Sequence, residues 1–183
     1  NPEGWMLDFS TKLKWNYCHG LECQAFLDVY DRYGGDYLYK YVKQFADTMI
    51  NENGRIYGYK KTNYNLDHVN SGKILFRLYE REKDPRYKIA MDTLRAQLAS
   101  QPRTSDGGFW HKKIYPYQMW LDGIYMGSPF YAQYAATFNE PEDFADVVSQ
   151  FLIIAKHTYD KKTGLYRHAW DEIKALPWSD LKT

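Results

Sequence analysis

The sequence has little cysteine, no long apolar run and no excess of charge of one sign. Its two cysteines, Cys18 and Cys23, are five residues apart, which fits neither a disulfide framework nor a common zinc site. We interpret both as small buried hydrophobic residues on one helix. The chain has 24 basic and 23 acidic residues, so its net charge of +1 gives no general basic field for binding nucleic acid. No apolar run approaches the roughly 20 residues that a membrane-spanning helix needs.

What is present indicates a folded domain rather than a disordered chain. Of the 183 residues, 44% are hydrophobic and 18% are aromatic, and only seven are prolines. A chain of this length buries roughly 70% of the surface that its unfolded form exposes, which is enough for a core. The chain begins Asn1-Pro2-Glu3 without a basic and apolar leader, so we expect no export signal in it. Bacterial cytoplasm and periplasm stay equally open as its location.

Three glycine-aromatic segments recur at a nearly constant interval. They read Asn53-Gly54-Arg55-Ile56-Tyr57, Asp106-Gly107-Gly108-Phe109-Trp110-His111 and Thr163-Gly164-Leu165-Tyr166-Arg167-His168. Gly54 and Gly108 are 54 residues apart, and Gly108 and Gly164 are 56 apart. A fixed period of this size indicates one structural unit that is repeated three times.

An apolar stripe with the period of a helix precedes each of these segments. The three stripes share one spacing and comprise Leu38, Tyr41, Val42, Phe45 and Met49; Tyr87, Ala90, Met91, Leu94 and Leu98; and Phe144, Val147, Val148, Phe151, Leu152 and Ala155. We interpret each as the apolar side of an amphipathic helix. Pro85 and Pro141 stand just before the second and third stripes, where a first-turn proline costs little.

A second, more aromatic helix is expected before each stripe, so that the repeating unit is a helical hairpin. We expect these leading helices at about 15–31, 67–82 and 118–138, and the whole units at about 13–57, 65–112 and 117–170. No convincing run of alternating β-branched residues appears, so the predicted fold class is all-α. Stacked hairpins form an open solenoid or a closed ring, and the glycines, aromatics and carboxylates of the leading helices favour a ring around a cavity. Closure commonly takes six hairpins, so the sequence predicts a single partial (α/α) toroid domain over 1–183.

Polar side chains recur at equivalent positions of the repeats. Asp67 and Asp122 are 55 residues apart near the starts of the second and third leading helices, and His111 and His168 are 57 apart in the loops. Equivalent positions on adjacent hairpins would place both carboxylates at one mouth of the ring. Two carboxylates that face two histidines and Lys112 suit acid–base chemistry on a sugar acid.

Each of these residues also has a purely structural explanation. Asp67 stands where a helix N-cap would stand. Asp122 is harder to explain in this way because its neighbours are apolar, and an aspartate in such surroundings is costly unless it is paired or protonated. A carboxyl that keeps its proton near neutral pH is what a general acid requires.

The histidines and the lysine have ordinary roles open to them as well. His111 and His168 could stack on Trp110 and Trp170, and Lys112 could be a solvated surface charge. A metal site is disfavoured, because the sequence has no HExxH motif and no cluster of cysteine and histidine.

Three segments together resemble the unsaturated rhamnogalacturonyl hydrolases, which form glycoside hydrolase family 105. They are Leu66-Asp67-His68-Val69-Asn70-Ser71-Gly72, then Asp106-Gly107-Gly108-Phe109-Trp110-His111-Lys112, then Tyr117-Gln118-Met119-Trp120-Leu121-Asp122-Gly123-Ile124-Tyr125-Met126-Gly127. The last segment is the most specific of the three. The resemblance covers nearly all of the chain and corresponds to the N-terminal half to two-thirds of the usual domain, which is an (α/α)6 barrel.

The resemblance implies a substrate and a mechanism. Members of this family remove the 4,5-unsaturated galacturonyl group from the non-reducing end of rhamnogalacturonan oligosaccharides, by hydration of the vinyl ether double bond. Asp122 would be the general acid that protonates C4 before water adds at C5, and Asp67 would help to orient the substrate. The residues implied to line the substrate pocket are Tyr17, His111, Lys112, Trp120 and His168. No metal or other cofactor is implied.

The family continues with further hairpins that are not found after Trp170. The sequence therefore predicts half a barrel, whose open faces self-association or a complementary C-terminal fragment would cover. Two other functions remain open. One is an unsaturated glucuronyl hydrolase of the related toroid family, and the other is a non-catalytic carbohydrate-binding or assembly module.

Overall fold

A computed structural model describes residues 14–179 of the chain. Position 13, where the first expected unit begins, and the Asn1-Pro2-Glu3 start therefore lie outside the described residues. The chain divides into two compact units. The first comprises Asn1–Tyr59 and Asp67–Leu94, and the second comprises Lys60–Leu66 and Arg95–Thr183.

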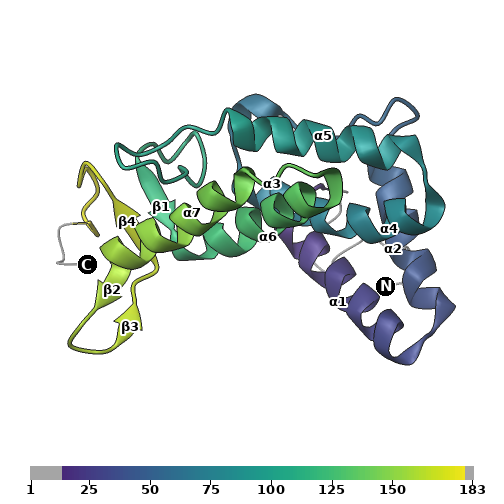
Figure 1. Cartoon of the computed structure of the whole chain (residues 1–183), viewed down its shortest axis with the longest axis horizontal. Coiled ribbons are helices and arrows are strands. Elements are labelled where there is room, and N and C mark those ends of the chain that lie inside the picture. Colours follow the sequence, from purple (N-terminus) through teal and green to yellow (C-terminus); the bar gives the residue numbers. More distant parts are fainter. Residues whose placement is uncertain (1–13, 180–183) are drawn as a thin grey trace. The chain divides into compact units, whose positions relative to one another are not determined.

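The first unit opens with the expected helical hairpin, formed by α1 (Tyr17–Tyr33) and α2 (Asp36–Met49) (Figure 1). The side chain of Asn16 caps α1 by accepting a hydrogen bond from the backbone N–H of His19. Gly34 ends α1 with a φ of 77°, and Gly35 follows with a φ of 101°. Both values lie in the left-handed region that favours glycine, so this pair of residues fixes the tight turn between the helices.

The second leading helix is interrupted, whereas the sequence predicted one continuous helix over 67–82. It consists of α3 (Leu66–Asn70), the 3₁₀ turn η2 (Ser71–Lys73) and α4 (Ile74–Glu82). Contacts with the start of α1 explain the change. Ser71 Oγ donates to the carbonyl of Asn16 at 2.5 Å, and a side chain at Gly20 would come within 2.7 Å of the Ser71 Cα. The backbones of η2 and α1 thus approach more closely than two regular helices would.

The first two apolar stripes are buried. In α2, Leu38, Val42, Phe45 and Met49 are buried and only Tyr41 is partly exposed. All five members of the second stripe are fully buried in α5 (Pro85–Ala99), which begins at the expected proline. Phe45 also stacks on the Trp15 ring, with centroids 5.9 Å apart. Amphipathic periodicity therefore located these core residues correctly.

The second unit contains the third hairpin, α6 (Leu121–Phe138) packed against α7 (Asp143–Thr158), and the short turn η1 (Lys61–Asn63) (Figure 1). The sequence predicted that the leading helix begins at 118, but 118–120 is extended. These residues form the strand β1 (Gln118–Trp120), which pairs antiparallel with β4 (Ala169–Asp171). A second small ladder joins β2 (Tyr159–Asp160) to β3 (Leu165–Tyr166). Strands this short leave no alternating pattern in a sequence, which is why they were not predicted.

The third apolar stripe is largely exposed, unlike the other two. Phe144, Val148, Phe151 and Leu152 all face solvent among the described residues, and Leu152 is 65% exposed. The buried side of α7 is instead Val147, Gln150, Ile154 and Thr158. Here a polar side chain, Gln150, lies inside because it bonds to a loop of the same unit. The buried side is therefore rotated away from the apolar stripe.

Both cysteines lie on α1 and are free, as the sequence predicted, but only Cys23 is buried. Burial raises the pKa of the Cys23 thiol, so that side chain behaves as an inert hydrophobic group. Within 14–179, none of the helices combines the length and apolar character that crossing a bilayer requires.

Candidate functional site

Trp120 is the centre of an aromatic cluster in the second unit. Its ring stacks on the ring of His111, with centroids 4.7 Å apart and planes at 8°, and on the ring of Tyr115 at 4.9 Å and 14°. The indole Nε1 donates to Gln118 Oε1 at 3.1 Å, which fixes the orientation of the ring. Trp120 ends β1 and directly precedes α6, so the short strand determines where this ring lies.

Asp122 occupies the first turn of α6, beside this cluster. Its side chain is 36% exposed, yet its Oδ1 is buried and accepts no hydrogen bond from the described residues. The Nε2 of His168 lies 3.9 Å from Oδ1. The end of a helix at which Asp122 lies favours negative charge, whereas the burial of Oδ1 disfavours it. The surroundings of this carboxyl are thus mixed, not wholly apolar as its sequence neighbours suggested.

His111 is held by its backbone on both sides. Its N–H donates to the carbonyl of Gln118 at 2.8 Å, and its own carbonyl accepts from the N–H of Leu66 at 3.1 Å. The side chain is buried, and one of its ring nitrogens lies within 4.8 Å of an Asp122 carboxylate oxygen.

His168 and Lys112 lie around the same ring. The centroids of the His168 and Trp120 rings are 5.6 Å apart, and the Lys112 Nζ lies 6.0 Å from the Trp120 centroid. The carbonyl of His168 accepts from the N–H of Leu121 at 2.6 Å, which ties this loop to the start of α6. Five of the seven predicted site residues therefore gather in the second unit, namely Lys112, His111, Trp120, Asp122 and His168.

The other two predicted residues, Tyr17 and Asp67, belong to the first unit. Asp67 is 8% exposed and lies in the first turn of α3. It is not an N-cap, because the helix already begins at Leu66. Tyr17 is the first residue of α1 and is half exposed, and its carbonyl accepts from Asn70 Nδ2 at 3.1 Å. Nearby in the chain, burial lowers the pKa of Lys73 to about 8.

The histidines do not stack where the sequence suggested. Trp110 packs against Tyr117 at 4.7 Å, and Trp170 stacks on His157 at 3.5 Å, while His111 and His168 both contact Trp120. His157 Nε2 also lies 2.7 Å from Asp106 Oδ2. Burial tends to raise the pKa of the Asp106 carboxyl, but its hydrogen bonds with His157 and Thr104 outweigh burial and hold that pKa below its usual value.

Sequence reasoning missed three residues that position the site. Tyr115 stacks on Trp120, Gln118 binds both Trp120 and the backbone of His111, and Gln150 binds the loop before His111. Gln118 stands within the specific motif around Trp120, so its place in that string was a usable signal. Nothing in the sequence singled out Tyr115 or Gln150.

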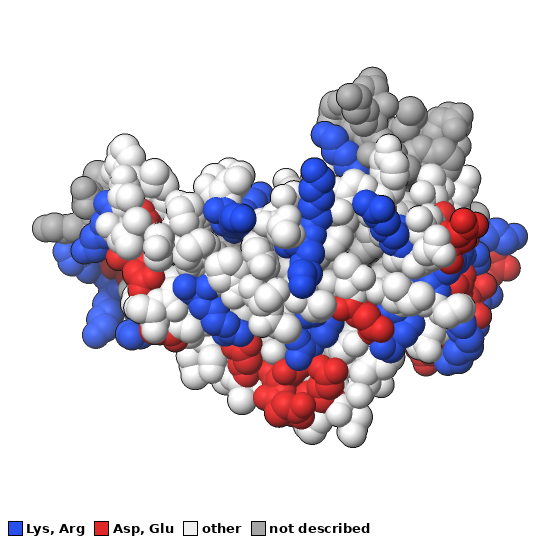
Figure 2. All heavy atoms as spheres, turned by 90° about the horizontal axis from the view of Figure 1, so that it is seen from above, with Lys and Arg blue, Asp and Glu red and all other residues white. Residues whose placement is uncertain are grey.

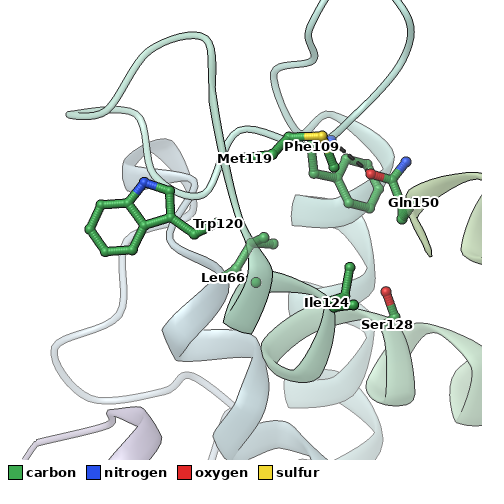
Figure 3. A pocket seen from close by; sticks show the side chains of 8 residues that line it. Leu66, Phe109, Met119, Trp120, Ile124, Ser128 and Gln150 are labelled. Carbon is green, nitrogen blue, oxygen red and sulfur yellow. Dashed lines mark hydrogen bonds between the residues drawn. The ribbon is translucent and has the colours of Figure 1, made fainter. Parts of the chain in front are cut away.

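A small pocket lies beside the cluster, between the loop of Phe109 and α6 (Figure 3). Its lining comprises Leu66, Phe109, Met119, Trp120, Gly123, Ile124, Ser128 and Gln150. Its volume is about 10 Å³, room for about one water molecule, whereas pockets for small ligands usually have hundreds of Å³. This pocket is therefore too small for a small-molecule ligand.

Charges of both signs are interspersed on the face drawn in Figure 2, and acidic side chains form a compact group at its lower edge. This face has no continuous basic stripe of the kind that a nucleic-acid backbone requires.

Comparison with known proteins agrees with the motifs. The sequence profile of Glycosyl Hydrolase Family 88 matches residues 1–183. A family 105 glycoside hydrolase from Clostridium acetobutylicum superposes with a TM-score of 0.89 at 42% identity, over 94% of this chain and 49% of that one. The resemblance to family 105 is thereby confirmed, and the chain spans about half the length of the solved relatives that it matches.

Two more distant structures show the fold alone. A possible family 105 member from Salmonella enterica has a TM-score of 0.77 at 24% identity and covers 94% of this chain and 47% of that one. A family 88 hydrolase from Bacteroides vulgatus has a TM-score of 0.64 at 17% identity, over 91% and 47% of the two chains. The helical hairpins described above are thus those of an incomplete (α/α)6 barrel, as the sequence predicted.

Proposed function

Because the chain belongs to Glycosyl Hydrolase Family 88, we propose that it removes a 4,5-unsaturated galacturonyl group from the non-reducing end of rhamnogalacturonan oligosaccharides. The observation that carries this proposal is the Asp122 carboxyl, whose buried Oδ1 accepts no hydrogen bond from the described residues and lies beside a histidine and a tryptophan. The side chain as a whole is 36% exposed, so the carboxyl can still reach a bound substrate and transfer a proton to it.

The reaction is a hydration, and it needs no redox partner. Asp122 donates its proton to C4 of the vinyl ether, which leaves an oxocarbenium-like centre at C5. Water adds at C5 and returns one proton to Asp122, which gives a hemiketal. The bond between C5 and the ring oxygen then breaks, a ketone forms at C5, and the hemiacetal at C1 releases the sugar chain as an alcohol.

The cationic side chains bind the acid group of the substrate. Lys112 and His168 both lie at the Trp120 ring, where they can pair with the uronate carboxylate. The Trp120 ring stacks on His111 and Tyr115, so a sugar would meet the part of Trp120 that stays exposed. The His111 side chain is buried and stacks on Trp120, so we assign it to holding that ring in place for the substrate. Asp67 and Tyr17 are assigned substrate-orienting roles on the motif resemblance alone.

The test is consumption of the double bond, followed by its ultraviolet absorbance. Unsaturated galacturonyl and glucuronyl oligosaccharides are offered separately, with Asp122→Asn and Asp67→Asn as variants. We expect loss of absorbance with the galacturonyl substrate and its abolition in Asp122→Asn. Faster consumption of the glucuronyl substrate would instead identify the chain as an unsaturated glucuronyl hydrolase. Calorimetric binding without consumption would indicate a carbohydrate-binding module.

The partner proposal concerns the exposed stripe of α7, which comprises Phe144, Val148, Phe151 and Leu152. We propose that a second copy of the chain covers it. The stripe contains no charged side chain. The same surface on two copies can therefore meet without electrostatic repulsion, which an interface with two-fold symmetry requires. An apolar stripe of this kind also marks interaction sites in general.

A further inference from the structure

Gln150 is a buried polar residue on α7 whose side chain binds a loop of the same unit. It is 1% exposed. Its Oε1 accepts from the N–H of Phe109 at 2.7 Å, and Figure 3 shows this amide oxygen turned toward Phe109. Its Nε2 donates to the carbonyl of Gly107 at 3.1 Å and to Asp146 Oδ1 at 2.9 Å. One side chain therefore joins two peptide groups of the loop to the helix.

A second pair of residues reinforces these bonds. Arg103 forms a two-bond pair with Asp146, at 2.8 and 2.6 Å, and also donates to the carbonyl of Gly107 at 2.8 Å. Its guanidinium lies 4.3 Å from the centroid of the Phe109 ring. Burial tends to raise the pKa of Asp146, but the hydrogen bonds from Arg103 and Gln150 and the charge of Arg103 together hold it below its usual value, so that carboxyl stays charged and keeps Gln150 oriented.

The loop leads directly to His111, and its consecutive N–H groups are all bonded. Gly108 donates to Thr104 Oγ1 at 2.9 Å, Phe109 to Gln150, and Trp110 to the carbonyl of Pro102 at 2.9 Å. His111 itself donates to Gln118. Gln150 is the one acceptor in this series that lies on a helix. The residue that it binds, Phe109, is two residues before His111.

We propose that Gln150 is a positioning residue, which fixes the Gly107–Phe109 backbone and thereby the place of the His111 ring against Trp120. Its effect on turnover rests on the proposed function, whereas its effect on the His111 ring does not. The charged and titratable groups around this amide are Asp146 on its own helix, Arg103 on the facing segment and Tyr131 on α6 beside Asp146.

The variant Gln150→Glu gives the sharpest test. A protonated carboxyl can accept from Phe109 and donate to Gly107, as the amide does. A charged one cannot donate, and it would face the Gly107 carbonyl and the Asp146 carboxylate. We therefore expect the His111 signals and the turnover of Gln150→Glu to be close to those of the wild type at low pH. They should differ from the wild type as the new carboxyl ionises. Methionine has about the volume of glutamine but forms none of these hydrogen bonds, so Gln150→Met should differ from the wild type at every pH. Ser149→Glu places the same charge on the exposed side of α7 and is the control.

Nuclear magnetic resonance of the imidazole groups is the first readout, because the chain has only five histidines and His111→Asn identifies the relevant signal. We expect the His111 signals of Gln150→Glu to match the wild type at low pH and to shift at high pH. Unchanged His111 signals in folded Gln150→Met and Gln150→Glu at every pH would overturn the proposal.

Turnover of the unsaturated oligosaccharide is the second readout. At neutral pH we expect about a tenfold loss in Gln150→Glu, recovered toward low pH, with no such pH dependence in Ser149→Glu. A wild-type chain that consumes no unsaturated uronyl substrate would contradict the proposed function, while the imidazole signals would still decide the role of Gln150.

Discussion

The ring of His111 fills the space in which a side chain at Gly123 would begin. A Cβ at Gly123 would lie 2.9 Å from His111 Nδ1, closer than real Cβ atoms approach other groups. Gly123 stands one residue after Asp122, so the absence of a side chain there lets the histidine and the carboxyl lie side by side.

Gly123→Ala should therefore displace the His111 ring and reduce turnover by about 10²-fold, even though alanine is the better helix former. Gly127→Ala is the matched control on α6, since its Cβ would meet methyl groups of Leu66 and Leu98 at 3.3 and 3.9 Å. Turnover of the two variants and their histidine signals are compared. Equal activity in both would show that the close approach at Gly123 has no role.

Lys73 gives a prediction about stability and pH. Its pKa falls from 10.5 in the unfolded chain to about 8 in the folded one, so between these values the unfolded state binds more protons. The stability of the wild type should rise as the pH increases from 8 to 10.5. Lys73→Met should be more stable than the wild type at pH 7, by roughly 1–3 kcal/mol, and this advantage should shrink as the pH approaches 10.5. Denaturant unfolding of both proteins across this range measures it, and a constant difference would refute the prediction.

Two neighbouring apolar residues of α7 should behave in opposite ways. Ile154→Ala should cost about 2–5 kcal/mol, because Ile154 is buried. Leu152→Ala should change the free energy of unfolding by less than about 0.5 kcal/mol, because Leu152 is exposed. Chemical denaturation of both variants tests the orientation of α7, and the reverse order of costs would contradict it.

Association through the α7 stripe predicts a concentration-dependent mass. Sedimentation of the wild type should show a dimer that dissociates on dilution, and Leu152→Glu should remain a monomer, since a buried unpaired charge would be costly. Glu142→Gln, at the exposed start of α7, is the control for a change in charge. A wild type that is monomeric at all concentrations would exclude the second copy.

Much of the fold was predictable because amphipathic helices give the sequence a clear helical periodicity of apolar residues. The stripes of α2 and α5 follow directly from the spacing of Val42, Phe45, Met91 and Leu94, whose environments agree with their polarity. The stripe of α7 was misleading because burial there is decided by the hydrogen bonds of Gln150, which periodicity does not register.

The structure brings together several residues that the sequence singled out, but the sequence did not indicate their arrangement. The motif around Asp122 singled out Trp120, and the repeat interval paired His111 with His168, which the structure brings to one ring. Their stacking partner could not be read from the sequence, because Trp110 and Trp170 were nearer along the chain. The strand β1, which places Trp120, depends on a partner about 50 residues away and has no local signal.

Because β1 pairs with β4, the segment after His168 forms one side of the candidate site. Trp120 is directly opposite Ala169 in this ladder. The residue that follows His168 is therefore paired with the residue whose ring is at the centre of the cluster. A cut by trypsin after Arg167 would therefore leave His168 attached to the site, through the pairing of β4 with β1 and through the hydrogen bond from the N–H of Leu121 to its carbonyl.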